Sequence, residues 1–382
     1  MATASGKLKV GLVLDTSLDT TEGVPQYVVH LGEWLRRQGH DVHYLVGESH
    51  RQDLANVHSL CRNIGVRFNG TRTTIPLPAS RRKLRRFMHD NHFDVLHVQT
   101  PHHPLMAQYL INAAPAGTAV VGTFHVLPFG RLSRYGNKAL GLWLRPSLKR
   151  FDQMLAVSSA AADYCRWSYG LSAEVLPNVV DYKLFHAAKP LPQYSDDTPT
   201  VLFLGRLVPR KGPMLLVQAA KQLADKGLKF RLIICGSGPL KPKLEAYIKA
   251  NGLQPYVELA GYVSEADKRR YYASADVAAF PSSGGESFGI VLLEAMSSGQ
   301  TVVLAGDNPG YRTVMEPHTE LLFNPRNATE LTDKIEYYLT HRQAADKLRR
   351  WSGDYAAKFD TATVGERLVN IYRQALRKRR RL

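Results

Sequence analysis

The chain has few cysteines and no long apolar run. Its three cysteines, Cys61, Cys165 and Cys235, are scattered and odd in number, which excludes a disulfide framework and a metal knuckle and indicates a reducing compartment. No stretch approaches the ~20 apolar residues of a membrane span. The first apolar run breaks at Asp15, too early for the core of a signal peptide. We therefore expect a cytoplasmic protein that does not cross the bilayer.

Acidic residues are also scarce. The chain has 50 Lys and Arg against 33 Asp and Glu, a net charge of +17. Between Asp94 and Asp152 there is no carboxylate, and a second basic run, R-K-R-R-R, covers 377–381. Such a charge predicts anionic partners, which could be nucleic acid, anionic lipid or nucleotide phosphates.

The motifs of several protein classes are missing. Helix-turn-helix, aromatic ribonucleoprotein and zinc-finger patterns are absent, so no nucleic-acid partner is expected and a basic nucleic-acid-binding protein is only a distant alternative. The glycine-rich loop Cys235–Pro239 lacks the third glycine of a dinucleotide fingerprint, and Pro239 interrupts it. This argues against a nicotinamide cofactor.

Apolar runs alternate with helical periodicity in both halves of the chain. Helical spacing over Val24–Gln38 is followed by a stop at Gly39, and a polar, proline-bearing stretch over 186–199 is typical of a linker. We predict an α/β protein with two doubly wound, Rossmann-like parallel-sheet domains that face each other across a cleft. The expected strands are Lys9–Leu14, Val42–Val46, Val95–Val98, Ala119–Phe124, Met154–Val157, Thr200–Gly205, Phe230–Gly236, Val257–Val263, Asp276–Pro281 and Thr301–Gly306.

The segment Gly284–Met296 reads G-G-E-S-F-G-I-V-L-L-E-A-M and places two carboxylates eight residues apart. If a helix begins near Ser287, Glu294 lies two turns inside it and Glu286 stands at its N-terminus, where free N–H groups attract phosphate. Ile290, Leu293 and Met296 should then turn inward. The alternative is a surface helix with a capping Glu286 and an exposed Glu294.

This segment resembles the E-x7-E motif of glycosyltransferase family 4, the retaining, nucleotide-sugar-dependent enzymes with the two-domain GT-B fold. The resemblance extends over nearly the whole chain and points, within the family, to the bacterial phosphatidylinositol mannosyltransferases. It implies an acceptor-binding N-terminal domain over 1–188, a donor-binding domain over 189–362 and a C-terminal helix over 363–382 that crosses back to the first domain.

The same resemblance implies the reaction. A hexose is transferred to a lipid acceptor such as phosphatidylinositol or a related glycolipid at the cytoplasmic face of the membrane. The first choice is mannose from GDP-mannose, and the second choice of donor is a UDP-sugar. Two other enzymes remain open: a transferase that acts on a soluble sugar or polysaccharide precursor, and a nucleotide-sugar epimerase.

The expected donor site lies in the second domain. The run G-R-L-V-P-R-K-G puts Arg206 and Lys211 at a strand-to-helix turn, a place suited to a diphosphate, and the family places matching cations there; Arg210 fits a solvated position better. Preplaced cations stabilise the leaving diphosphate, so neither a divalent metal nor a tightly bound cofactor is required. By resemblance, Glu286 faces the sugar hydroxyls and Glu294 faces the ribose. Ser287, Phe288 and Gly289 are expected to contact the sugar and phosphate. Gly236 and Gly238 are expected to lie near the nucleotide, and Tyr262 and Val263 near its base.

The expected residues of the first domain are fewer. His125 ends a strand, and the family places a histidine there beside the donor sugar. The segment S-L-D-T-T-E-G matches the family's glycine-rich first loop, in which Gly23 would approach the donor phosphate and Asp19 would bind the acceptor. Glu22 replaces the first glycine of that loop, so the contact geometry stays open.

Two basic segments indicate a membrane surface. Over Ser80–Asp90, Ser80 is the expected N-cap and Leu84, Phe87 and Met88 share one face of a helix, although these apolar residues could instead pack on the sheet and leave the cations in water. The acid-free segment Leu132–Pro146 has the composition of an interfacial loop. The residues expected to face anionic lipid are Arg81, Arg82, Lys83, Arg85, Arg86 and Trp143.

The mechanism follows from the resemblance together with the spacing. A double displacement needs two carboxylates about 5 Å apart across one anomeric carbon, and the family assigns Glu294 to the ribose. We therefore expect attack on the same face as the leaving group, with the leaving phosphate helping to deprotonate the acceptor and no enzyme nucleophile.

Overall fold

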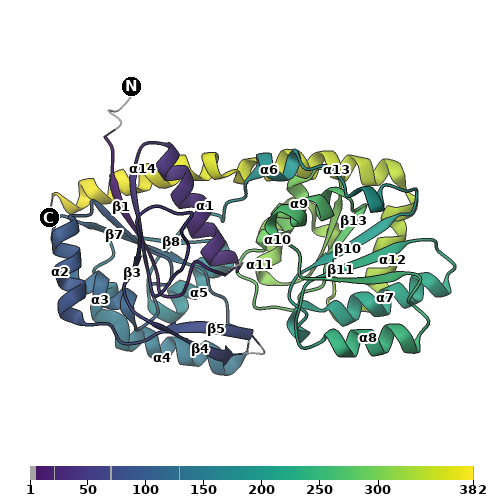
Figure 1. Cartoon of the computed structure of the whole chain (residues 1–382), viewed down its shortest axis with the longest axis horizontal. Coiled ribbons are helices and arrows are strands. Elements are labelled where there is room, and N and C mark those ends of the chain that lie inside the picture. The colour runs from purple at the N-terminus through teal and green to yellow at the C-terminus, as the bar shows by residue number, and fades with distance from the viewer. Residues whose placement is uncertain (1–5, 21, 69–70, 129, 382) are drawn as a thin grey trace. The chain divides into compact units, whose positions relative to one another are not determined.

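The computed structural model describes residues 6–20, 22–68, 71–128 and 130–381 (Figure 1). The chain forms two compact units, one of Met1–Val179 with Thr361–Leu382 and one of Val180–Asp360. The boundary therefore lies before the predicted one at 188. The stretch predicted as a linker belongs to the second unit, because Leu191 and Tyr194 are buried and Tyr194 Oη donates to Glu258 over 2.8 Å.

The first unit is built on a seven-stranded sheet in the order β3-β2-β1-β6-β7-β8-β9, and all of its pairings are parallel. The predicted strands of the first half are confirmed to within one residue. The strands are β1 (Lys9–Leu14), β2 (Asp41–Val46), β3 (Val57–Ser59), β6 (Val95–Val98), β7 (Ala119–Phe124), β8 (Gln153–Ala156) and β9 (Glu174–Val175), with a separate antiparallel hairpin of β4 (Asn63–Phe68) and β5 (Thr71–Pro76).

Helices cover this sheet with their apolar faces, as the periodicity predicts. The segment Leu132–Pro146, expected to be an interfacial loop, lies instead within a helix that buries Leu144 and Leu148. The helices of the first unit are α1 (Gly23–Arg37), α2 (Arg81–Asn91), α3 (Met106–Ala113), α4 (Arg131–Leu148), α5 (Ser159–Tyr169) and α14 (Thr361–Arg379).

The last helix, α14, packs on α1 and on β7. A Cβ atom at Gly365 would lie 2.5 Å from the Trp34 ring, so glycine permits the close approach of α14 to α1. At the sheet, the Tyr372 hydroxyl lies 2.7 Å from His97 Nδ1. The end of the chain is thus part of the core of the first unit.

The second unit has a six-stranded sheet in the order β12-β11-β10-β13-β14-β15, again with parallel pairings. The five predicted strands are present. The strands are β10 (Thr200–Leu204), β11 (Arg231–Cys235), β12 (Val257–Gly261), β13 (Val277–Phe280), β14 (Val302–Gly306) and β15 (Leu322–Phe323). The helices are α6 (Tyr182–His186), α7 (Pro213–Asp225), α8 (Lys241–Ala250), α9 (Glu265–Ala273), α10 (Ile290–Ser297), α11 (Pro309–Met315), α12 (Ala328–Thr340) and α13 (Arg342–Ala356), with short 3₁₀ turns at Pro192–Tyr194, Pro209–Lys211, Glu316–Leu321 and Ala357–Phe359.

Both sheets reverse their strand order at one point. In the first unit β2 and β6 lie on opposite sides of β1, and in the second unit β11 and β13 lie on opposite sides of β10. Ligands of open parallel sheets bind beyond the strand C-termini at such switch points. The loops after β1 and β6 and those after β10 and β13 are therefore where a site is expected. These loops contain half of the candidate catalytic, donor-binding and acceptor-binding residues, namely Asp19, Arg206, Lys211, Glu286, Ser287, Phe288 and Gly289.

Candidate active site

A buried cluster of charges occupies the switch point of the second sheet. The loop after β10 contributes Arg210 and Lys211, and the loop after β13 contributes Ser282 and Glu286. Glu286 Oε1 lies 2.5 Å from Arg210 Nη1, 2.9 Å from Lys211 Nζ and 2.9 Å from Ser282 Oγ. All three donors converge on this one carboxylate oxygen.

The cluster sets the charge of Glu286. Burial raises the pKa of this carboxyl, but the charges of Lys211 and Arg210 outweigh burial and bring the pKa to about 2. The pKa of Lys211 is lowered, mainly by burial. The charge of Glu286 opposes this effect, and the charge of Arg206 adds to it. Glu286 is thus an anion at neutral pH, beside two cations whose combined charge exceeds its own.

Two close backbone contacts hold these loops together. Gly212 has φ 71°, and a Cβ atom there would lie 2.2 Å from the carbonyl oxygen of Pro281. The Ser283 N–H donates to the Arg210 carbonyl over 2.8 Å. A Cβ atom at Gly310 would lie 2.0 Å from the Glu286 carbonyl, so glycine is required on both sides of the loop that carries Glu286.

Two expectations for this region are wrong in detail. Arg210 is not solvated; its side chain is 23% exposed and pairs with Glu286, a partner that sequence spacing alone could not reveal because the two lie on different loops. The helix begins at Ile290 rather than near Ser287, since Gly289 takes φ 109° at the N-cap. Ser287, Phe288 and Gly289 therefore precede the helix, and Glu294 lies about one turn inside it.

Glu294 is buried rather than exposed, so the surface-helix alternative is wrong. Its Oε1 lies 2.7 Å from Lys268 Nζ, and Tyr272 Oη donates to Oε2 over 3.4 Å. Burial raises the pKa of Glu294 against the opposing charge of Lys268. Lys268 also pairs with Glu265 over 2.7 Å, so α9 and α10 are joined by a buried ionic network that the sequence did not reveal.

The glycines after β11 have a structural explanation. A Cβ atom would lie 1.9 Å from the Gly205 carbonyl at Gly236 and 2.5 Å from the Leu207 carbonyl at Gly238. The Gly236 N–H already donates to the Gly261 carbonyl over 2.6 Å. Their role toward a nucleotide stays a prediction. Tyr262 and Val263 follow β12, and Tyr262 is 65% exposed. Their contact with a base stays a prediction.

In the first unit, His125 is the first residue after β7 and is buried. Its Nε2 lies 3.0 Å from the Gln99 Oε1 atom, and the Tyr27 ring packs edge-on against it. Burial lowers the pKa of His125 to about 3, so the imidazole is neutral at physiological pH.

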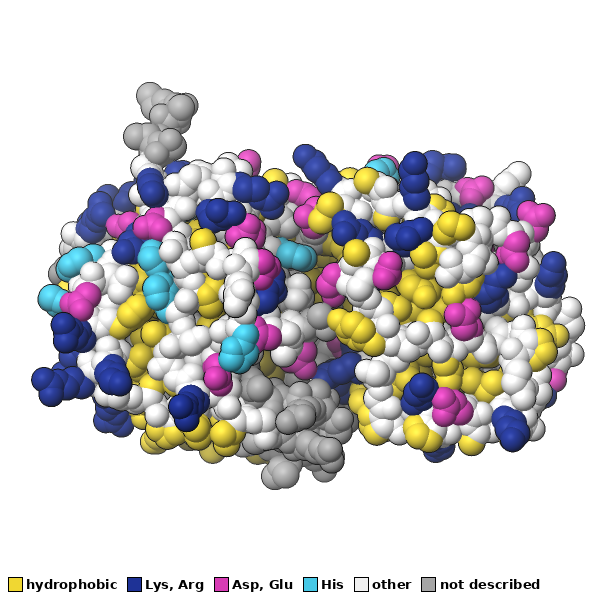
Figure 2. Space-filling view, in the orientation of Figure 1, with side chains coloured by type: hydrophobic (Ala, Val, Ile, Leu, Met, Phe, Trp, Pro, Cys, Tyr) yellow, Lys and Arg dark blue, Asp and Glu magenta, His cyan; other side chains and the backbone are white. Residues whose placement is uncertain are grey.

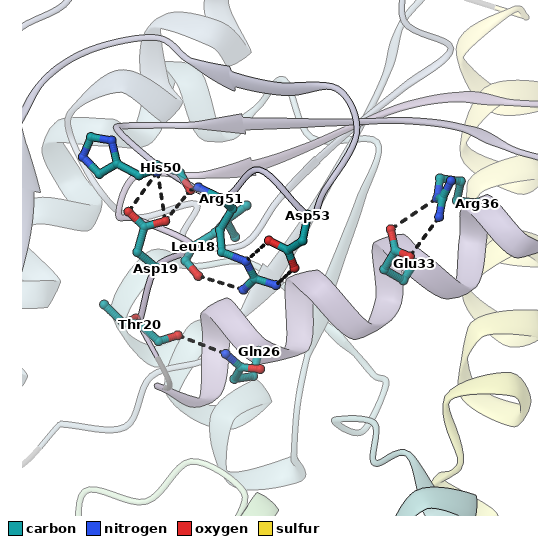
Figure 3. Close-up of polar contacts among 10 residues, drawn as sticks. Leu18, Asp19, Thr20, Gln26, Glu33, Arg36, His50, Arg51 and Asp53 are labelled. Atoms are coloured by element: carbon teal, nitrogen blue, oxygen red, sulfur yellow. Dashed lines mark hydrogen bonds and ion pairs between the residues drawn. The ribbon is translucent and has the colours of Figure 1, made fainter. Parts of the chain in front are cut away.

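Asp19 anchors the loop after β1 (Figure 3). Its carboxylate accepts hydrogen bonds from Ser49 Oγ at 2.6 Å and from the His50 N–H at 3.0 Å. Burial raises the pKa of Asp19, but these bonds outweigh burial and lower it. Its acceptor-binding role stays a prediction, as does that of Gly23, which is exposed at the start of α1.

Sequence reasoning missed a group of buried polar atoms at the first switch point. Asp15 follows β1, and Gln99, Thr100 and His102 follow β6. Among the described residues, one polar atom of each has no hydrogen-bond partner: Asp15 Oδ2, Gln99 Nε2, Thr100 Oγ1 and His102 Nδ1. Their position directly after predicted strands was the signal that could have found them.

Helix α2 is amphipathic, with Ser80 as its N-cap. Leu84 and Met88 are buried in the core, and the cations Arg81, Arg82, Lys83, Arg85 and Arg86 are exposed. Figure 2 shows Lys and Arg side chains gathered over this helix, at the left of the view. On α4, Trp143 is 69% and Leu142 66% exposed.

The described part of the chain contains neither a candidate membrane span nor a candidate metal site. No helix there is both long and apolar enough to cross a membrane. The same part contains no group of three or more His, Cys, Asp or Glu side chains that could hold a metal ion.

Two family models match the chain, one described as Glycosyltransferase Family 4 over residues 21–184 and one as Glycosyl transferases group 1 over 189–358. Solved structures share the fold. A glycosyltransferase of Rickettsia africae has a TM-score of 0.78 at 16% identity, covering 97% of this chain and 99% of that one. Anabaena HepE, solved with UDP, has a TM-score of 0.77 at 19% identity, covering 96% and 100%. The fold and the site define a GT-B glycosyltransferase.

Curated relatives extend this result along the chain. The phosphatidyl-myo-inositol mannosyltransferase of Mycobacterium tuberculosis strain H37Rv is 32% identical over 373 residues, covering 96% of each chain. That of Propionibacterium freudenreichii is 31% identical over 385 residues, covering 96% of this chain and 94% of the relative. The chain therefore belongs to glycosyltransferase family 4, and it is a nucleotide-sugar-dependent enzyme similar to these mannosyltransferases.

Proposed function

We propose that this enzyme transfers mannose from GDP-mannose, with retention of configuration, to phosphatidylinositol or a related glycolipid at the cytoplasmic membrane surface. The main support is that similarity to phosphatidyl-myo-inositol mannosyltransferases covers 96% of the chain and includes the loops that form the charge cluster.

The charge cluster fits the departure of a nucleoside diphosphate. Arg206 and Lys211 would meet the charge that builds on the diphosphate, which is the usual main source of rate in such reactions. The Glu286 carboxylate would accept a hydrogen bond from a sugar hydroxyl. This assignment needs no divalent metal, because cations of the chain itself supply the charge.

The two carboxylates of the motif serve separate networks, which supports attack on the same face as the leaving group. Glu286 is held by Arg210 and Lys211, whereas Glu294 is held by Lys268 and Tyr272. Because each carboxylate has its own partners, the two are not expected to act together across one anomeric carbon, as a double displacement requires. The leaving phosphate would then take the acceptor proton.

The proposed membrane contact is mainly electrostatic. Because the apolar face of α2 is buried in the core, its cations rather than its apolar residues would meet anionic lipid, each contributing on the order of 1 kcal/mol. Trp143 and Leu142 of α4 would supply the apolar part. A soluble acceptor remains a second candidate, since a 2-deoxystreptamine N-acetyl-D-glucosaminyltransferase of Niallia circulans is 32% identical over 45% of this chain.

Product extraction tests the proposal. The enzyme is incubated with phosphatidylinositol vesicles and labelled GDP-mannose or UDP-glucose. We expect label in the organic phase with GDP-mannose and much less with UDP-glucose. Label that stays in the aqueous phase, bound to a soluble sugar, would favour the second candidate, and calorimetric titration of GDP and UDP would fix the nucleobase independently of the acceptor.

A further inference from the structure

Strands β6 and β7 are joined by two successive side-chain hydrogen bonds on one face of the first sheet. His97 Nε2 lies 2.7 Å from Thr123 Oγ1, and two residues further along each strand Gln99 Oε1 lies 3.0 Å from His125 Nε2. Residues two apart on a strand point to the same side, which explains the repeat. The first pair is tied to α14 through the Tyr372 hydroxyl, 2.7 Å from His97 Nδ1.

The second pair decides which nitrogen of His125 carries its proton. The amide oxygen of Gln99 can only accept a hydrogen bond, so Nε2 is the protonated nitrogen and Nδ1 keeps its lone pair. Gln99 is fully buried, and among the described residues its Nε2 has no partner. The side chain is therefore held by His125 on one side and presents an unused N–H donor on the other.

We propose that Gln99 is a positioning residue that fixes the ring orientation and the Nε2–H tautomer of His125. The proposal rests on the role that the family resemblance predicts for His125, a contact with the donor sugar. A neutral amide at this position orients the ring without adding charge, whereas a carboxylate would also favour the imidazolium. Among the residues that the structure describes, the other titratable groups that interact with His125 are Tyr27 of α1, His97 of β6 and His102 of the loop after β6.

Three variants of the full chain test this. Gln99→Leu removes the acceptor and should lower kcat about tenfold, with a smaller change in the KM of the donor. Gln99→Glu should give kcat a new inflection, rising with pH above 6, because the added carboxylate raises the pKa of His125. Thr123→Val breaks the neighbouring pair but leaves Gln99 and His125 bonded, so it should add no inflection.

A spectroscopic readout is independent of turnover. With ¹⁵N-labelled histidine, His125 should show the Nε2–H tautomer in the parent enzyme and in Thr123→Val, and a changed tautomer ratio in Gln99→Leu. An unchanged ratio in Gln99→Leu, or a folded Gln99→Glu without a new inflection, would overturn the positioning role. If His125→Asn keeps full turnover, the role of His125 itself fails, which is a different outcome from failure of Gln99 alone.

Discussion

Arg210 donates to the same carboxylate oxygen of Glu286 that Lys211 contacts, at 2.5 Å and 2.9 Å. Two adjacent residues of the loop after β10 thus hold a single carboxylate of the loop after β13. Arg210→Gln should lower kcat about tenfold, because Glu286 loses one of its two charge partners and part of its orientation. The acid limb of the pH profile should also move to higher pH, since a lost cation raises the pKa of Glu286.

The control for that substitution is Arg210→Lys, which keeps the charge and should retain more turnover than Arg210→Gln. Steady-state kinetics, extended below pH 4 as far as the enzyme stays folded, provides the measurement. If both variants match the parent enzyme, Arg210 does not contribute to the site.

Lys211→Ala should lower turnover by about two orders of magnitude, because it removes charge stabilisation of the departing diphosphate. Single-turnover kinetics with saturating donor separates this effect from weaker binding. Lys226→Ala is the matched control, since Lys226 pairs with Asp333 and Glu336 on the surface of the same unit. Normal turnover of a folded Lys211→Ala protein would remove the diphosphate assignment.

The buried pair of Lys268 and Glu294 should be costly to break from one side. Lys268→Met leaves the Glu294 carboxylate without its cation and should destabilise the second unit by about 3–5 kcal/mol. The double variant Lys268→Met, Glu294→Gln should lose less. Trp351 is the only tryptophan between residues 180 and 360, so its fluorescence in a background with the other tryptophans replaced by Phe follows unfolding of this unit. Equal losses in the single and double variants would show that the pair is not coupled.

Buried neutral histidines should make the first unit sensitive to acid. Burial lowers the pKa values of His97 and His125 to about 3, against about 6.5 in an unfolded chain. Between these values the unfolded state binds more protons, so the free energy of unfolding should fall as pH drops below 6.5, by up to ~1.4 kcal/mol per pH unit for each histidine. Urea unfolding at pH 7.5, 6.5 and 5.5 measures this slope. His97→Gln should make the slope shallower, and an unaltered slope would mean that His97 is not buried neutral.

The cations of α2 should govern attachment to membranes. Replacing Arg81, Arg82, Arg85 and Arg86 with Gln should weaken sedimentation with phosphatidylinositol vesicles, most clearly at low salt, and leave nucleotide affinity intact. Replacing the exposed Lys241, Lys243 and Lys249 of α8 provides a control in the second unit. Equal losses in both variants would indicate a general effect of net charge rather than contact through α2.

Much of the fold could be predicted because parallel strands buried on both faces are continuous apolar runs. The strands β1 and β10, which begin at Lys9 and Thr200, are examples, and their boundaries follow from local composition. Helix starts were harder where the backbone departs from common dihedral angles. Gly289 moves the start of α10 to Ile290, and whether a glycine caps a helix or continues a loop depends on packing against Tyr311.

The sequence alone determined the alternation of strands and helices, the basic charge and the motif that contains Glu286 and Glu294, because these depend on residues near one another along the chain. Only the tertiary structure decided that Arg210 pairs with Glu286, that Lys268 pairs with Glu294 and that Gln99 bonds His125. Such pairs join side chains 26 to 76 residues apart on different loops or helices. Which loops meet is set by the order of strands in each sheet, and that order depends on how whole helices pack rather than on any local pattern.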